Sequence, residues 1–242
     1  MLTKEKAIVL RASDYKEKDK IVTLFSLENG LIKAVLKGIK SEKAKLKFAS
    51  MPFCFAEFEL TKGAGLSIVS GATLIESFFD ITTDISAFYA GCSVLKLIEN
   101  ISSFGEQGNQ LFVLTLKTLK AIMDFVYLKS NNQLLLRLIK IKFILSLCEL
   151  NGTKINLTKC ASCGKLTHDE VYFDHSQGNA LCSKCCESSC ALVPTKIIAL
   201  IILIEKSDFD TLTHIKSSEN DVMSVETLVF KSFEAKTSCK FE

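Results

Sequence analysis

The segment Cys160-Ala161-Ser162-Cys163, followed after eighteen residues by Cys182-Ser183-Lys184-Cys185, decides how the C-terminal part of this chain folds. Two C-x2-C pairs at this separation are typical of a four-cysteine zinc site, because each pair forms a tight turn that offers two thiolates to one tetrahedral ion. Between the pairs, Asp174, Gly178 and Asn179 favour a turn that brings them together. We predict one structural Zn²⁺, without a catalytic role because four thiolates leave no open position. The predicted ligands are Cys160, Cys163, Cys182 and Cys185.

Other readings of these cysteines stay open at the level of the sequence. The alternative to zinc is a pair of disulfides or inert buried thiols. The fourth ligand is ambiguous, because Cys186 or Cys190 could replace Cys185, and His175 is a further conceivable ligand.

The N-terminal residues lack a signal peptide, and the longest aliphatic run, residues 197–204, is too short to cross a bilayer. We therefore expect a cytoplasmic protein, in which thiols or metal ligands are commoner than disulfides.

The composition is that of an ordinary globular protein, but its charge is unevenly distributed. Of the 242 residues, 48% are apolar and 24% are charged, with a net charge of +3. Residues 1–50 contain twelve Lys or Arg against six Asp or Glu, whereas the remaining 192 contain eighteen against twenty-one. A basic N-terminal part favours a polyanionic partner, with nucleic acid ahead of an acidic membrane or protein surface.

Residues 6–76 have the period of short β-strands. In the third of them, Ile32, Ala34 and Leu36 share one face, while Lys33 and Lys37 share the other with apolar neighbours. Short strands without a long helix among them predict a small closed barrel. The expected strands are 7–10, 21–25, 31–37, 53–60 and 66–75, with a turn at Asn29-Gly30.

Two groups of lysines interrupt these strands. One follows the first strand, and the other lies between the third and fourth, where it extends the row begun by Lys33 and Lys37. Each single lysine is best explained as a solvated side chain, but the groups together favour phosphate contact, because many lysines on a small domain sum to strong non-specific binding. With only two arginines, Arg11 and Arg137, base readout is not expected. The first group consists of Lys16, Lys18 and Lys20. The expected nucleic-acid-binding residues are Lys33, Lys37, Lys40, Lys43, Lys45 and Lys47.

From about Asp80 the apolar period becomes helical. The first helix is expected to begin at Thr83 or Asp84 and to end near Gly105. Further helices are expected over 110–128 with Asn109 as cap, from Asn131 or Asn132 to 150, from Pro194 to about 206, and over 221–236. The predicted fold class is α+β, with a domain at 1–79, a helical domain at 80–242 and a zinc module inserted at about 155–192.

Signatures of catalysis are missing from the sequence. It contains neither a G-x-x-x-x-G-K-[ST] phosphate loop, nor an H-E-x-x-H helix, nor a G-x-S-x-G elbow. The three histidines have no pattern that suggests acid–base work. We expect a binding protein rather than an enzyme.

The chain resembles a known family in two separated regions. Asp14 to Ser26 (DYKEKDKIVTLFS), Gly30, Leu36 to Ser41 (LKGIKS) and Met51-Pro52-Phe53 are similar to the N-terminal signature of the RecO family of bacterial DNA repair proteins. The similarity continues through the helical part and the two C-x2-C pairs. Arginines that often follow the position of Gly38 in this family are replaced by lysines here.

This resemblance implies an N-terminal OB-fold, a helical domain and a zinc module. It also implies a protein that binds single- and double-stranded DNA, anneals complementary strands and, with RecR, helps to load RecA onto strands coated by single-strand-binding protein. Such a protein would be nucleoid-associated. The alternative is a non-catalytic zinc-containing adaptor between proteins, in which the basic N-terminal part is incidental.

Overall fold

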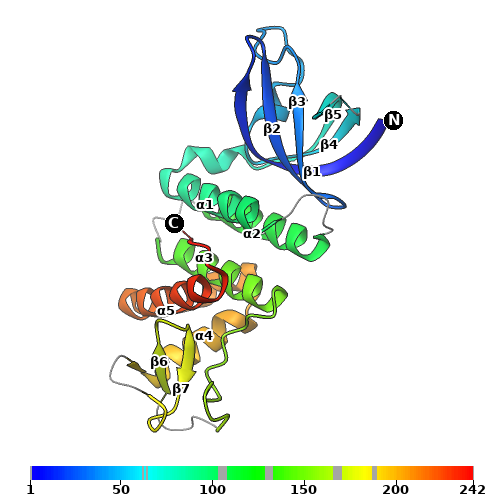
Figure 1. The fold of residues 1–242 in the computed structure, drawn as a ribbon. Coiled ribbons are helices and arrows are strands. Elements are labelled where there is room, and N and C mark those ends of the chain that lie inside the picture. Colours follow the sequence, from blue (N-terminus) through cyan, green and yellow to red (C-terminus); the bar gives the residue numbers. More distant parts are fainter. Residues whose placement is uncertain are drawn as a thin grey trace. The chain divides into compact units, whose positions relative to one another are not determined.

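The computed structural model describes residues 2–61, 63, 65–102, 108–128, 133–165, 171–186 and 190–241. They form two compact units, 1–128 and 129–242. The first is a sheet followed by two helices, and the second contains helices and a small sheet (Figure 1). The predicted α+β class is therefore confirmed. In the ranges just given, no helix is both long enough and apolar enough to cross a membrane.

The first unit begins with five strands whose hydrogen-bonded order closes on itself. The order is β1-β2-β3-β5-β4, and β4 pairs back onto β1. β3 and β5 run parallel, whereas the other neighbours run antiparallel. This is a closed five-stranded barrel, the architecture that OB-folds use in a partly open form. Its strands are β1 (Leu2–Tyr15), β2 (Asp19–Ser26), β3 (Gly30–Leu36), β4 (Cys54–Thr61) and β5 (Ser67–Ser77).

The long strand β1 joins two sides of the barrel. Lys4 pairs with Glu59 of β4, whereas Ala12 pairs with Val22 of β2. The register shifts by one residue between Val9 and Arg11, and such a bulge bends the strand from one partner toward the other. The sequence predicted only the apolar centre of this strand, residues 7–10, because its ends carry charged side chains.

The barrel is filled by the side chains that the alternating pattern predicted. Every second residue of β3 and β4 belongs to, or packs against, one buried cluster, as the two-residue period of a strand requires. The inward-facing residues of these strands are Ile32, Ala34, Leu36, Cys54, Ala56, Phe58 and Leu60.

Two helices, α1 (Ile85–Ile101) and α2 (Asn109–Tyr127), pack on the outside of the barrel after a short 3-10 helix, Phe79–Thr83. Asp84 caps α1 by accepting a hydrogen bond from the backbone N–H of Ala87 at 2.8 Å. The ring of Phe112 lies 5.6 Å from those of Phe25 and Phe55, centroid to centroid. The aromatic face of the barrel is therefore covered by helix. The domain boundary expected after residue 79 stays a prediction.

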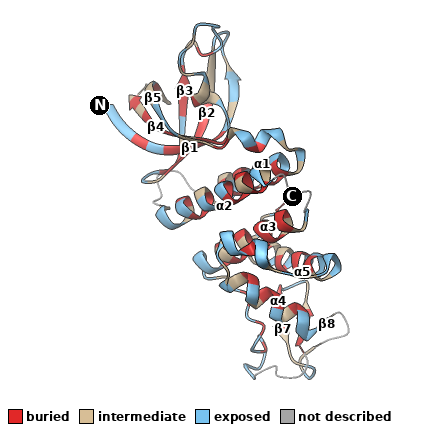
Figure 2. Cartoon of the chain, turned by 180° about the vertical axis from the view of Figure 1, so that it is seen from behind, coloured by how far each residue is buried: buried red, intermediate tan, exposed pale blue. Residues whose placement is uncertain are grey.

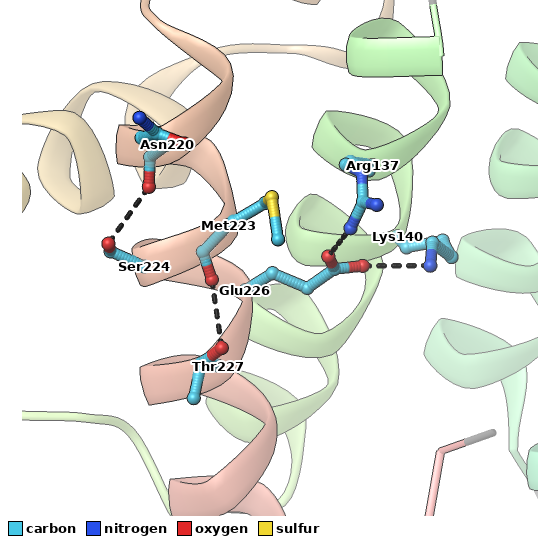
Figure 3. Close-up of polar contacts among 7 residues, drawn as sticks. All are labelled: Arg137, Lys140, Asn220, Met223, Ser224, Glu226 and Thr227. Carbon is cyan, nitrogen blue, oxygen red and sulfur yellow. Dashed lines mark hydrogen bonds and ion pairs between the residues drawn. The ribbon is translucent and has the colours of Figure 1, made fainter.

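The second unit surrounds α3 (Gln133–Leu150), which contacts α5 (Glu219–Thr237), α4 (Thr195–Lys206) and a 3-10 helix, Phe209–His214. Figure 3 shows how Glu226 of α5 reaches across to Arg137 and Lys140 of α3. Glu226 is only 9% exposed, and its oxygen lies 2.8 Å from the ammonium of Lys140. The two cations offset the cost of burying this carboxylate.

Between α3 and α4 lies a three-stranded antiparallel sheet of order β7-β6-β8. β6 (Val171–Asp174) and β7 (Asn179–Leu181) form a hairpin, and β8 (Ala191–Val193) pairs with the other edge of β6. The turn that the sequence predicted at Asp174, Gly178 and Asn179 is the turn of this hairpin. The sequence predicted none of the three strands, because three or four residues are too few to show a period.

The predicted helices lie close to the observed ones, with two corrections and one gap. Asn109 does not cap α2: it is the first helical residue, and Gly108 stands at the cap position without a side-chain hydrogen bond. α5 begins two residues earlier than expected, because Ser218 caps it by accepting the N–H of Asp221 at 3.2 Å. The expected features at Gly105, Asn131 and Asn132 lie outside the described residues.

Candidate metal centre and nucleic-acid interface

The four predicted thiols lie together in the second unit. The sulfur atoms of Cys160, Cys163, Cys182 and Cys185 are all within 4.8 Å of one another. The Sγ atoms of Cys163 and Cys182, from the two different pairs, are 3.9 Å apart. A tetrahedron of thiolates at about 2.3 Å from zinc has edges of about 3.8 Å. The donor set and its spacing therefore fit one zinc ion.

Each C-x2-C pair forms a hydrogen-bonded turn of its own. In the first, the N–H of Gly164 donates to the carbonyl of Cys160 at 2.9 Å, with Gly164 at φ +71°. In the second, the N–H groups of Cys185 and Cys186 donate to the carbonyl of Cys182 at 3.1 and 3.0 Å. A bond of 2.8 Å from the N–H of Ala161 to the carbonyl of Ala180 ties the first turn to β7, which leads into the second. The short sheet therefore sets the distance between the pairs.

The thiols influence one another's pKa. Burial raises the pKa of Cys160, but backbone N–H donors from Cys163, Cys182 and Ser162 outweigh it and lower this pKa to about 6. For Cys182, the N–H of Cys185 lowers the pKa. A hydrogen bond with Ser162 lowers the pKa of Cys185, yet contacts with the neighbouring thiols and burial raise it to about 12. Adjacent thiolates repel, so a nearby cation is what would let all four ionise.

The alternative ligands lie outside this cluster. Among the described residues, the group that could hold a metal contains neither Cys186 nor Cys190, and it does not contain His175. The ring of His175 packs against Phe173 at 5.0 Å, and burial lowers its pKa. His168 lies outside the described residues.

The second group of lysines lies on a segment that closes one end of the barrel. We call residues 37–50, between β3 and β4, the lysine cap. Ile39 and Ala49 of the cap are buried in the barrel cluster, and Ala44, Leu46 and Phe48 pack against it. The lysines at 37, 40, 43, 45 and 47 alternate with these apolar residues and are exposed. The cap is thus a folded lid rather than a solvated loop, although it contains almost no regular secondary structure.

The two lysine groups, separate in the sequence, meet at this end of the barrel. The N–H of Lys40 donates to the carbonyl of Lys18 at 3.2 Å, and the N–H of Gly38 donates to the carboxylate of Asp19 at 2.8 Å. Figure 1 shows both segments at the end of the barrel remote from α1 and α2, and Figure 2 shows their exposure. Residues 14–20 and 37–47 contain eight lysines against four acidic residues, a surplus of four.

Within the described residues, most cap lysines are not neutralised by ion pairs. Lys40 forms one, with Asp14 at 3.0 Å. Lys37, Lys43, Lys45 and Lys47 have no carboxylate within ion-pair distance in the part of the chain that the structure describes. Lys33 is exposed in the middle of β3, four residues before the cap begins.

The aromatic residues near the lysines are mainly structural. Phe53 is 1% exposed and lies against α1, and Phe48 packs on the barrel cluster. The ring of the half-buried Tyr15 has its centroid 5.3 Å from the ammonium nitrogen of Lys16. The rings of Phe48, Phe53 and Phe55 are therefore used in the packing of the first unit.

Comparison with known proteins gives the same family over nearly the whole chain. The profile described as "Recombination protein O N terminal" matches residues 1–78, and that described as "Recombination protein O C terminal" matches residues 82–235. The chain belongs to the Recombination protein O family. The resemblance found in the sequence is confirmed, and with it a role in DNA repair and recombination.

Individual relatives in the family cover most of the chain. The "DNA repair protein RecO" of Alkaliphilus metalliredigens is 31% identical over 185 residues, which cover 76% of this chain and 72% of the relative. That of Desulforamulus reducens is 32% identical over 180 residues, covering 74% and 67%. That of Caldicellulosiruptor saccharolyticus is 25% identical over 217 residues, covering 90% and 86%.

Proposed function

We propose that this family member binds DNA through the lysine cap and the adjoining turn 16–18, irrespective of base order, and anneals complementary single strands. The observation that carries this proposal is the cap itself. Its apolar residues hold it on the barrel, and its lysines face solvent at one end. OB-folds bind oligonucleotides on strands 2 and 3 and through the loop between strands 1 and 2, and Lys33 and Lys16–Lys18 occupy those positions here.

Sequence-independent binding is supported by the positions of the two arginines. Arg11 Nε contacts both carboxylate oxygens of Glu99 at 2.8 Å, and Arg137 pairs with Glu226. Their guanidinium groups, the side chains best suited to reading guanine, are therefore already bound within the protein. Lysines act on phosphate as point charges, which gives affinity without base readout.

Annealing without a nucleotide-driven step has a simple electrostatic basis. Two single strands repel each other through their phosphates, and lysines that screen both backbones remove that barrier, so base pairing supplies the free energy. The family resemblance adds the partners: RecR, single-strand-binding protein and, indirectly, RecA. The proposed role is non-enzymatic, and the proposed location is the nucleoid in the cytoplasm.

We further propose that Cys160, Cys163, Cys182 and Cys185 hold one structural Zn²⁺. Bound there, the metal would supply folding free energy to the second unit, since it would join the two C-x2-C turns that the short sheet brings together. Metal analysis of protein purified without added metal is expected to return about one zinc per chain. No metal, together with ten titratable thiols in the denatured chain, would remove the proposal.

The binding proposal is tested by removing charge from the cap. In the variant K40A/K43A/K45A/K47A, the slope of log K against log salt for a single-stranded oligonucleotide should become less steep by up to about 0.7 per lost contact. Strand annealing should be abolished, while thermal unfolding stays cooperative. The matched control is K206A/K216A/K231A/K240A, which removes the same charge from exposed lysines of the second unit and should bind and anneal as the wild type.

The alternative is an adaptor between proteins. If affinity of the wild type for DNA does not fall steeply with salt, the adaptor replaces the DNA-binding proposal. Full annealing by the cap variant would instead show that other residues meet the DNA.

A further inference from the structure

An acidic residue holds the start of the lysine cap. Asp19 is the first residue of β2, and its carboxylate accepts the N–H of Gly38 at 2.8 Å. Gly38 lies just after β3, at φ +63°, where the chain leaves the barrel wall and turns into the cap. A bond from a backbone N–H to a carboxylate is stronger than a neutral one, so this contact fixes the turn.

Two neighbouring contacts also hold the cap on the barrel, but each is weaker than the contact of Asp19. The backbone bond between Lys40 and Lys18 joins the cap to the β1–β2 turn at the next position. The ion pair between Lys40 and Asp14 adds little, because the side chain of Asp14 is 71% exposed and such pairs are well screened. Asp19 is therefore the main polar anchor at the start of the cap, beside the apolar contacts that Ile39 and Leu46 make with the barrel cluster.

A carboxylate at this place is unfavourable for DNA binding if only charge matters. Asp19 lies among eight lysines and lowers the positive potential that attracts phosphate. Its contact with Gly38 has the opposite effect, because an ordered cap loses less conformational entropy when it binds. The two effects of the same side chain therefore have opposite signs and can be separated.

We propose that Asp19 is a positioning residue for DNA binding: it presents the lysines of the cap as one preformed surface, and this gain exceeds the electrostatic cost of its charge. The inference rests on the proposed DNA binding by the cap.

Three substitutions test it by the sign of their effect. Asp19→Ala removes both the charge and the acceptor. Asp19→Asn removes the charge but keeps an oxygen that can accept the N–H of Gly38. Glu17→Ala removes the same charge from an exposed residue of the same turn and is the matched control.

Affinity for a single-stranded oligonucleotide is measured at one salt concentration by fluorescence anisotropy. Asp19→Ala should bind roughly three- to tenfold more weakly than the wild type, because the cap must then be ordered on binding. Glu17→Ala and Asp19→Asn should bind as tightly as the wild type or more tightly. If Asp19→Ala binds as tightly as Glu17→Ala, charge alone decides and the inference is wrong, although DNA binding by the cap stands. If the wild type shows no salt-dependent binding at all, the proposed function itself has failed.

A measurement on the wild type covers the case in which Asp19→Ala does not fold. In free protein, hydrogen exchange at the Gly38 amide should be slow, as for an amide of the barrel, and exchange at the exposed residues Glu42 and Lys43 should be faster. Exchange at Gly38 as fast as at those exposed positions would overturn the proposal without any variant.

Discussion

Gly178 shows how a single residue can decide the packing of an element. It lies in the turn between β6 and β7 with φ +65°, and its carbonyl accepts the hydroxyl of Ser232 of α5 at 2.7 Å. A Cβ atom at this position would come within 2.8 Å of the Cα and 2.9 Å of the carbonyl oxygen of Ser232. Because both contacts are to backbone, no rotamer change can relieve them. Gly178 therefore allows the hairpin of β6 and β7 to pack closely against α5.

Replacing Gly178 by alanine should destabilise the protein by more than backbone strain alone. An alanine at positive φ costs about 1–2 kcal/mol, and the clash with α5 should add about 1–3 kcal/mol. The matched control is Gly152→Ala, because Gly152 has φ +67° and open space around it. Urea unfolding of both variants measures the difference. Equal losses of unfolding free energy would mean that the turn and α5 separate easily.

At the scale of elements, three short irregular segments carry the proposed metal and DNA sites. The C-x2-C turns are held by their own backbone hydrogen bonds and by the sheet, whereas the lysine cap is held by alternating apolar side chains. Each device fixes a segment without a helix or strand of its own. That explains why the lysines of the cap can stay exposed on a rigid support, and why the thiols can lie within 4.8 Å of one another.

The identity of the proposed fourth metal ligand can be tested at the second turn. Cys185 belongs to the cluster of four thiols and Cys186 does not, so Cys185→Ser should lose most of its zinc, and Cys186→Ser should keep it. The two substitutions are chemically identical and adjacent, which makes each the control for the other. Zinc per chain after dialysis is the measurement. The reverse result would move the ligand to Cys186.

At the scale of the whole molecule, the proposed metal and the proposed DNA surface lie in different compact units. The cysteine cluster belongs to residues 129–242, whereas the lysine cap and the barrel that supports it belong to residues 1–128. A role of zinc in the fold should therefore be local to the second unit.

Removal of zinc by a strong chelator should accordingly affect the second unit and leave the first unit unchanged. We expect faster hydrogen exchange at residues 160–165 and 171–185 and in α5, which Ser232 links to the hairpin, but unchanged exchange in β1 to β5. Affinity for single-stranded DNA should change little. Loss of DNA binding with unchanged hydrogen exchange in the barrel would show that the segment with the four cysteines contributes to DNA binding.

The sequence alone determined what depends on local pattern. The spacing of four cysteines, the two-residue period of β3 and β4, the helices from 133 to 150 and from 195 to 206, and the excess of lysine near the N-terminus are all visible along the chain. Tertiary structure decided what joins distant residues: the packing of α1 and α2 on the barrel, the addition of β8 to the sheet, the folding of the cap onto the barrel cluster, and the contact of Asp19 with Gly38. Periodicity reports which face of an element is apolar, but not which partner covers it. The sequence shows Asp19 only as an acidic residue close to lysines. Its contact with the backbone N–H of Gly38 becomes visible only in the folded structure.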